Sequence, residues 1–229
     1  MRFHKMLQNN PFSLVVSLSA NNLDMAKAAL DGGADAVKVH MNVLHAASQN
    51  TFGTFEDNRD FLTKLIEMAG DRPVGAVVGG GDAFITVEEK KELEDMGLDF
   101  VSCYAEHLPA FMLKGDKITK MVALHDTYET VLPAVKNSEI QVVEASIMPA
   151  TQYRSPLTYF DLLQYRKICE AVTQPVLIPT QKKIYPDDVF ALRDAGCKAV
   201  MIGAVVVDES TPEAWYKATC AYRNAVDHL

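Results

Sequence analysis

Long apolar stretches are missing from this sequence of 229 residues. The apolar run Leu14–Leu18 near the amino terminus is too short to span a membrane, and no signal-peptide cleavage pattern follows it. No low-complexity stretch or linker divides the chain. These absences predict one soluble domain over residues 1–229, in the cytoplasm and without a membrane partner.

An excess of positive charge is also missing. The 22 Lys and Arg residues are outnumbered by 30 Asp and Glu residues, which gives a formal net charge of −8. This balance argues against a broad nucleic-acid-binding surface. It leaves open a small anion site built from a few lysines and backbone amides.

Cysteines are few, and none has a CxxC or zinc-ligand spacing. We therefore expect all of them to be small apolar packing residues in a reducing compartment. They are Cys103, Cys169, Cys197 and Cys220.

Several catalytic motifs do not occur. The absence of HExxH, GxSxG and Walker patterns argues against a metalloprotease, a serine hydrolase of that type and an NTP-cleaving enzyme. No glycine-rich turn follows the first apolar run, where the sequence reads Ala20-Asn21-Asn22. An open doubly wound sheet usually carries such a turn, so this fold is disfavoured.

What the sequence does contain is a regular alternation of β-rich runs and charged segments of helical period. Eight strands are predicted: Leu14–Ser19, Ala36–Asn42, Val74–Gly79, Phe100–Glu106, Thr119–Asp126, Ile140–Ser146, Val176–Thr180 and Ala199–Val205. The predicted helical segments are Leu23–Asp31, Arg59–Ala69, Thr86–Met96, Pro109–Lys114, Tyr128–Val135, Tyr159–Val172, Pro186–Ala195 and Pro212–Val226. Eight strands that each precede a helix indicate an α/β protein with a single (βα)8 TIM barrel.

Residues at the segment boundaries agree with this division. Gly32 stands where a helix should end, and Thr86 with Glu89 has the spacing of a helix start. Pro73 and Pro175 directly precede runs of β-branched residues, where a proline can open a strand. The longest irregular piece, residues 43–58, lies on the catalytic side of a barrel, as either a lid or a partly ordered loop.

Polar residues recur at every second position of the predicted strands, so they share one face. Such sets are Lys38, His40 and Asn42; Ser102, Tyr104 and Glu106; Glu144 and Ser146; and Ser17 and Ser19. The opposite faces are apolar and suit packing against helices, so the polar faces should point into the barrel. A buried charge is costly unless it is paired, and Lys38 and Glu144 should therefore meet an opposite charge or a ligand.

These residues are the catalytic candidates. Lys38 and Glu144 could transfer protons as a pair, while Glu106 and Asp126 at strand ends are further acid–base candidates. His40 could polarise a carbonyl or move protons. The competing interpretations are an internal ion pair that only fills the barrel and a purely structural histidine.

A second set of candidates follows the last two strands, where barrels often bind phosphate. At Gly203 and Ala204 the backbone can approach an anion closely. Donors and positive charge would come from the segment Thr180, Gln181, Lys182 and Lys183. The competing interpretation is that Gly203 relieves crowding and the lysines are solvated.

The segment from Asp194 to Ala204 resembles the last strand of the phosphate-binding barrel superfamily, which includes N-acetylmannosamine-6-phosphate 2-epimerase, indole-glycerol-phosphate synthase and several FMN enzymes. The segment from Asp31 to Val39 is similar to the corresponding part of the epimerase. The resemblance implies that Gly203 is a phosphate-loop position. Two features depart from this group: residues 179–184 contain no glycine, and Gly79-Gly80-Gly81 stands where the epimerase has a catalytic lysine.

Together these observations predict an enzyme of carbohydrate metabolism that acts on a small phosphorylated sugar or related metabolite. The expected reaction is proton transfer next to a carbonyl, of the isomerase, epimerase or lyase type, without a required cofactor. An FMN-dependent oxidoreductase and a non-catalytic phospholigand-binding barrel are the alternatives. A divalent cation on Glu106, Asp126 and Glu144, and assembly into a homo-oligomer, stay open.

Overall fold

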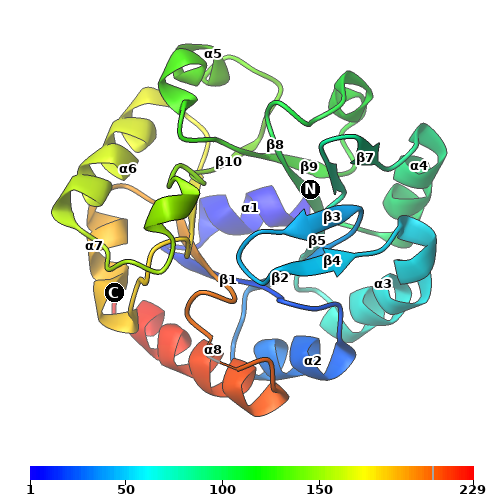
Figure 1. Cartoon of the computed structure of the whole chain (residues 1–229), viewed down its shortest axis with the longest axis horizontal. Coiled ribbons are helices and arrows are strands. Elements are labelled where there is room, and N and C mark those ends of the chain that lie inside the picture. Colours follow the sequence, from blue (N-terminus) through cyan, green and yellow to red (C-terminus); the bar gives the residue numbers. More distant parts are fainter. Residues whose placement is uncertain (208) are drawn as a thin grey trace.

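The chain forms a closed barrel of parallel strands in the computed structural model, which describes residues 1–207 and 209–229. The strands follow one another around the barrel in the order β1-β12-β11-β10-β9-β8-β5-β2, and every neighbouring pair is parallel. The helices surround this barrel (Figure 1). The predicted TIM barrel is therefore confirmed.

The eight predicted strands are all present, and each ends earlier than predicted. The barrel strands are β1 Ser13–Ser17, β2 Ala36–His40, β5 Val74–Val77, β8 Phe100–Tyr104, β9 Thr119–Ala123, β10 Val142–Glu144, β11 Val176–Pro179 and β12 Ala199–Ile202. The first residue after several strands still donates its amide to the neighbouring strand, as Leu18 does to Lys38 and Leu124 to Glu144, and the chain then turns into the loops. Glu106 and Asp126, predicted to lie in strands, are in such loops.

All the predicted helical segments are present. The helical segments after β1 are α2 Leu23–Asp31, α3 Phe55–Ala69, α4 Val87–Met96, η1 Ala110–Leu113, η2 Tyr128–Thr130, α5 Leu132–Val135, η3 Ala150–Gln152, α6 Tyr159–Ala171, η4 Pro186–Asp188, α7 Val189–Asp194 and α8 Pro212–Asp227. Helix α3 begins four residues before the predicted Arg59, and η3 is an addition that was not predicted. The predicted start at Thr86 is a capping box, in which the Thr86 side chain accepts from the Glu89 amide and the Glu89 carboxylate accepts from the Thr86 amide.

An additional helix, α1 (Arg2–Asn9), closes the barrel at the end where the strands begin. The Phe3 ring stacks on the Phe100 ring with centroids 3.8 Å apart, and both side chains are fully buried. Gly75 makes room for Phe100, because a Cβ at that position would lie 2.3 Å from the ring. Outside the barrel, Arg2 forms a bidentate ion pair with Asp99 at 2.7 and 2.9 Å. The sequence did not predict α1, because its polar residues hide the buried Phe3 and Leu7.

Two hairpins cover the opposite end of the barrel. Residues predicted to form a long irregular loop contain the hairpin of β3 (Val43–His45) and β4 (Asn50–Phe52). The triple glycine forms the hairpin of β6 (Gly79–Gly80) and β7 (Ala83–Phe84). The β3–β4 hairpin lies across the barrel mouth (Figure 1).

No helix in residues 1–207 and 209–229 is long and apolar enough to cross a membrane.

Replacing Phe3 with alanine should lower the free energy of unfolding by about 3–5 kcal/mol, because it removes a fully buried aromatic ring from the closed end of the barrel. The matched control is Phe160→Ala on α6, whose side chain is 67% exposed and whose loss should change stability by less than about 0.5 kcal/mol. Urea unfolding of the three proteins measures the difference. Equal midpoints for both variants would show that α1 does not close the barrel.

Candidate active site

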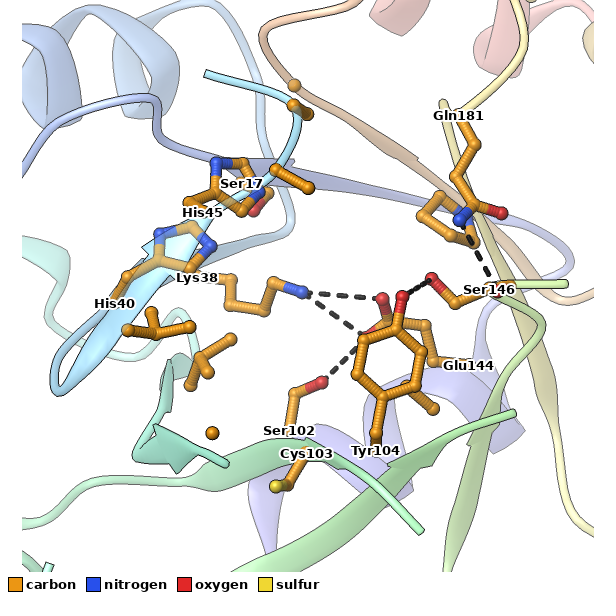
Figure 2. A pocket seen from close by; sticks show the side chains of 18 of the residues that line it. Ser17, Lys38, His40, His45, Ser102, Cys103, Tyr104, Glu144, Ser146 and Gln181 are labelled. Carbon is orange, nitrogen blue, oxygen red and sulfur yellow. Dashed lines mark hydrogen bonds and ion pairs between the residues drawn. The ribbon is translucent and has the colours of Figure 1, made fainter. Parts of the chain in front are cut away.

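A cavity of about 410 Å³ opens at the carboxyl ends of the barrel strands, beneath the β3–β4 hairpin. Side chains from strands on every side reach it, and the polar ones gather at its floor (Figure 2). The polar lining residues from the barrel strands include Ser17, Lys38, His40, Ser102, Tyr104 and Glu144, all of which the strand alternation placed inside. The predicted inward face is thus where the cavity lies.

An ion pair crosses the barrel at the floor of this cavity. The Nζ atom of Lys38 lies 3.2 Å from Oε2 and 3.5 Å from Oε1 of Glu144. Lys38 comes from β2 and Glu144 from β10, which are four positions apart in either direction around the barrel. Opposite strands therefore aim their charges at each other across the barrel axis (Figure 2).

Both charges are almost completely shielded from solvent, with Lys38 4% and Glu144 5% exposed. Ser102 on β8 donates its hydroxyl to Glu144 Oε2 at 2.7 Å, so this oxygen has two partners. A buried ion pair of this kind is tolerable because each charge is compensated and hydrogen bonded. Loss of either charge would leave the other uncompensated.

One wall of the cavity is built from hydroxyl and amide groups. The Tyr104 hydroxyl lies 3.4 Å from Ser146 Oγ, and Gln181 Nε2 donates to the Tyr153 hydroxyl at 2.7 Å. Cys103 also lines the cavity, but burial raises the pKa of its thiol to about 12, with Glu106 and Glu144 adding to the effect. Cys103 therefore stays protonated and is a poor nucleophile.

His40 lies beside the ion pair with its side chain 1% exposed. Neither ring nitrogen has a hydrogen-bond partner in the described part of the chain. Burial lowers the pKa of His40 well below its usual value, and nearby His45 and Lys38 lower it further. The neutral imidazole thus has one donor and one acceptor without a partner, and both nitrogens are closed to solvent.

The β3–β4 hairpin is stacked on this histidine. The His45 ring lies 4.2 Å from the His40 ring and the Phe52 ring 4.8 Å from it, measured between centroids. The Nδ1 atom of His45 lies 2.8 Å from Ser48 Oγ. Burial, followed by the charge of Lys38, lowers the pKa of His45 to about 4, so both rings are neutral at neutral pH.

The other wall is formed after β11 and β12. Thr180, Gln181, Gly203 and Ala204, all predicted anion-site residues, line the cavity there together with Val205. The Gly203 amide donates to Thr180 Oγ1 at 3.1 Å. Within residues 1–207 and 209–229, the amides of Ala204 and Val205 have no hydrogen-bond acceptor. This turn can therefore offer two adjacent N–H groups to an anion.

Two predicted anion-site residues lie elsewhere. Lys182 is buried against α6, where its Nζ atom lies 3.4 Å from Oδ2 of Asp161. The Asp161 side chain is held there because it forms the capping box at the start of α6. The Lys183 side chain does not line the cavity, and the Lys183 amide donates to the Ser155 carbonyl.

The predicted acid–base residues Glu106 and Asp126 are exposed and outside the cavity lining, and Asp126 contacts the neighbouring His125. In the part of the chain that the structure describes, no three His, Cys, Asp or Glu residues form a group that could hold a metal ion. The grouping of Glu106, Asp126 and Glu144 around a divalent cation is therefore wrong, because only Glu144 points inward.

Three functional candidates were missed in the sequence: His45, Tyr153 and Arg154. Tyr153 and Arg154 lie in loops, where strand alternation gives no orientation, and His45 lies in the short strand β3, within residues predicted to form a long irregular loop. His45 comes five residues after the candidate residue His40, and this short separation was the available signal.

The similarity of this chain to known proteins lies in its three-dimensional structure. No family model and no curated protein sequence matches it. Thiamine phosphate pyrophosphorylase from Pyrococcus furiosus is similar in structure, with a TM-score of 0.68, 18% identity and coverage of 96% of this chain and 97% of that one. A mutant tryptophan synthase alpha-subunit from the same organism has a TM-score of 0.68 at 14% identity, covering 93% and 98%.

The N-acetylmannosamine-6-phosphate 2-epimerase from Clostridium perfringens is also similar, with a TM-score of 0.57, 17% identity and coverage of 85% and 87%. The resemblance predicted from the sequence is confirmed in this sense, since barrels of that group are among the similar structures. At these identities the likeness establishes the fold.

The stability of the protein should fall as pH is lowered from about 6.5 toward 4. The pKa of His45 is lower in the folded chain than in the unfolded chain, so the unfolded chain binds the proton first. His45 alone contributes a loss of up to about 3 kcal/mol over this window. His45→Gln should flatten the dependence of the unfolding free energy on pH, whereas the exposed control His228→Gln should not. Parallel curves for wild type and His45→Gln would contradict this assignment.

Proposed function

We propose that this barrel is an enzyme that moves a proton next to the carbonyl group of a small phosphorylated compound, such as a sugar phosphate. The reaction is of the isomerase, epimerase or lyase type. The observation that carries the proposal is the buried Lys38–Glu144 pair at the floor of an open cavity. An ion pair that only filled the barrel would have side chains packed over it.

In this proposal Glu144 is the base. Its carboxylate takes a proton from the carbon beside the carbonyl, and the electron pair of the broken C–H bond moves onto the carbonyl oxygen. The Lys38 ammonium stabilises the negative oxygen, and the neutral His40 ring supplies a further hydrogen bond. Ser102 holds the carboxylate in place through its 2.7 Å bond. Return of the proton from Glu144 to the neighbouring carbon, while the hydroxyl proton there moves to the former carbonyl oxygen, gives the isomer.

The phosphate of the substrate would bind across the cavity, on the turn after β12. Ala204 and Val205 supply amides there, and Thr180 can donate its hydroxyl because its oxygen accepts from Gly203. A Cβ at Gly203 would come within 3.3 Å of the Ser17 carbonyl, so glycine fits this packed corner. The phosphorylated compounds in the names of two similar structures support an anion site in this fold. We assign no phosphate contact to Lys182 or Lys183.

We also propose a cytoplasmic location, which suits the free thiols of Cys103, Cys169, Cys197 and Cys220.

The first test is a thermal-shift screen against inorganic phosphate, FMN and a panel of sugar phosphates. A ligand at a hundredfold excess over its Kd adds about 2.7 kcal/mol of stability and raises the Tm. Each sugar phosphate that binds is then incubated with enzyme in D2O, and NMR follows deuterium uptake at the carbon beside the carbonyl.

Glu144→Gln should slow deuterium uptake by at least about a hundredfold, because the amide cannot accept the proton. The control Glu170→Gln changes an exposed residue of α6 and should keep the wild-type rate. Glu144→Gln leaves Lys38 uncompensated, so the double variant Lys38→Gln/Glu144→Gln, which removes both charges, keeps the test usable if the single variant unfolds. Binding without deuterium uptake in the wild type would favour a non-catalytic barrel, and binding of FMN alone would favour the oxidoreductase.

A further inference from the structure

Arg154 joins two of the segments that enclose the cavity. Its Nη2 donates to the Ala47 carbonyl at 3.2 Å, and its Nη1 lies 3.5 Å from the Val205 carbonyl. Ala47 belongs to the turn of the β3–β4 hairpin, and Val205 belongs to the turn after β12, so both line the cavity. A single guanidinium therefore spans from the lid hairpin to the turn at which we place the phosphate.

The backbone holds Arg154 at this place. Its φ of 64° is in the left-handed region, which an arginine adopts at a cost of about 1–2 kcal/mol. The Arg154 amide donates to the Gln181 carbonyl at 2.9 Å and so ties this residue to the loop after β11. The strained residue is thus fixed against the same wall of the cavity as Thr180.

The guanidinium has donors left over. It carries five N–H groups, and the two contacts to Ala47 and Val205 use two of them. Both present partners are neutral carbonyls at long distances. An anion is a stronger partner for the remaining three N–H groups than a carbonyl, and the guanidinium fork suits phosphate oxygens.

The other cations near the cavity are committed elsewhere. Lys38 is paired with Glu144, and Lys182 is paired with Asp161. Arg154 has no carboxylate within 4.0 Å among residues 1–207 and 209–229. Arg154 is exposed at the rim, outside the cavity lining, and its contact with the Val205 carbonyl at 3.5 Å makes it the cation that could reach a phosphate on the Ala204–Val205 amides.

We propose that Arg154 binds the phosphate and couples it to closure of the β3–β4 hairpin. This inference rests on the proposed function, since it takes the anion site after β12 as given. The bound phosphate fixes the guanidinium through its free N–H groups, and the fixed guanidinium holds the Ala47 carbonyl. Phosphate binding therefore stabilises the closed hairpin over Lys38, His40 and Glu144, and excludes water while the proton moves.

The experiment uses the full chain with inorganic phosphate in chloride buffer as the probe. Calorimetry gives the phosphate Kd, and hydrogen–deuterium exchange of the peptide that spans residues 43–52 reports on the hairpin. In the wild type, saturating phosphate should slow exchange of this peptide. Arg154→Gln should weaken phosphate binding at least tenfold, speed exchange of the hairpin without phosphate, and abolish its slowing by phosphate.

Two further variants sharpen the test. Arg154→Lys keeps the charge but loses the fork, so it should recover part of the phosphate affinity but not the protection of the hairpin. Arg166→Gln on α6 is the matched control, because Arg166 is exposed and likewise donates to a backbone carbonyl, that of Asp194 at 3.1 Å. It should leave the phosphate Kd and the exchange of residues 43–52 unchanged.

The outcomes separate the two proposals. If the wild type binds phosphate and Arg154→Gln binds it within twofold, or if phosphate slows the hairpin equally in both proteins, the role of Arg154 is overturned and the anion site stands. If the wild type binds neither inorganic phosphate nor any sugar phosphate, the anion site itself is overturned, and the role of Arg154 with it.

Discussion

The contact between Lys38 and Glu144 joins strands on opposite sides of the barrel, and each charge makes the other tolerable there. A barrel interior is ordinarily filled by branched apolar side chains, and one charge placed among them would cost several kcal/mol. The pair constrains its surroundings in two ways. The strands that carry Lys38 and Glu144 must keep their register. The two ends of the barrel must also limit the access of water to the ion pair.

The two ends of the barrel meet this second requirement differently. At one end, α1 inserts Phe3 and Leu7 among apolar side chains that include Phe100 and Met121, and this buried apolar layer closes the barrel. At the other end, the β3–β4 hairpin packs the rings of His45 and Phe52 on His40, and the cavity lies between the hairpin and the ion pair. The barrel is thus filled with apolar side chains at the α1 end and carries its cavity at the hairpin end.

Sequence reasoning predicted the parts of this arrangement that depend on strand periodicity. Alternation along a strand fixes which side chains share a face, so the inward positions of Lys38, Ser102 and Glu144 followed once the strands were assigned. Beyond the end of a strand this rule stops. Glu106 and Asp126 lie past those ends and are exposed, although the alternation continued to Glu106 predicted an inward side chain.

Local competition between partners is the other reason for the differences. The sequence places Lys182 beside Thr180 and Gln181. In the structure, Lys182 instead forms an ion pair with the carboxylate of Asp161, a helix-capping residue 21 positions earlier in the chain. Arg154 was overlooked because its position depends on a left-handed backbone conformation that glycine, not arginine, usually signals. Helix α1 was overlooked because its two buried residues find their partners on strands far along the chain.

The placement of the ion pair also bears on how the barrel assembles. Lys38 belongs to the half made of β1, β2, β5 and β8, and Glu144 belongs to the half made of β9, β10, β11 and β12. A fragment with only one half would carry an uncompensated charge in its interior, and neither half could form a dry core alone. Closure of the ring is thus the event that satisfies both charges, which makes the two halves a single cooperative unit rather than two modules joined edge to edge.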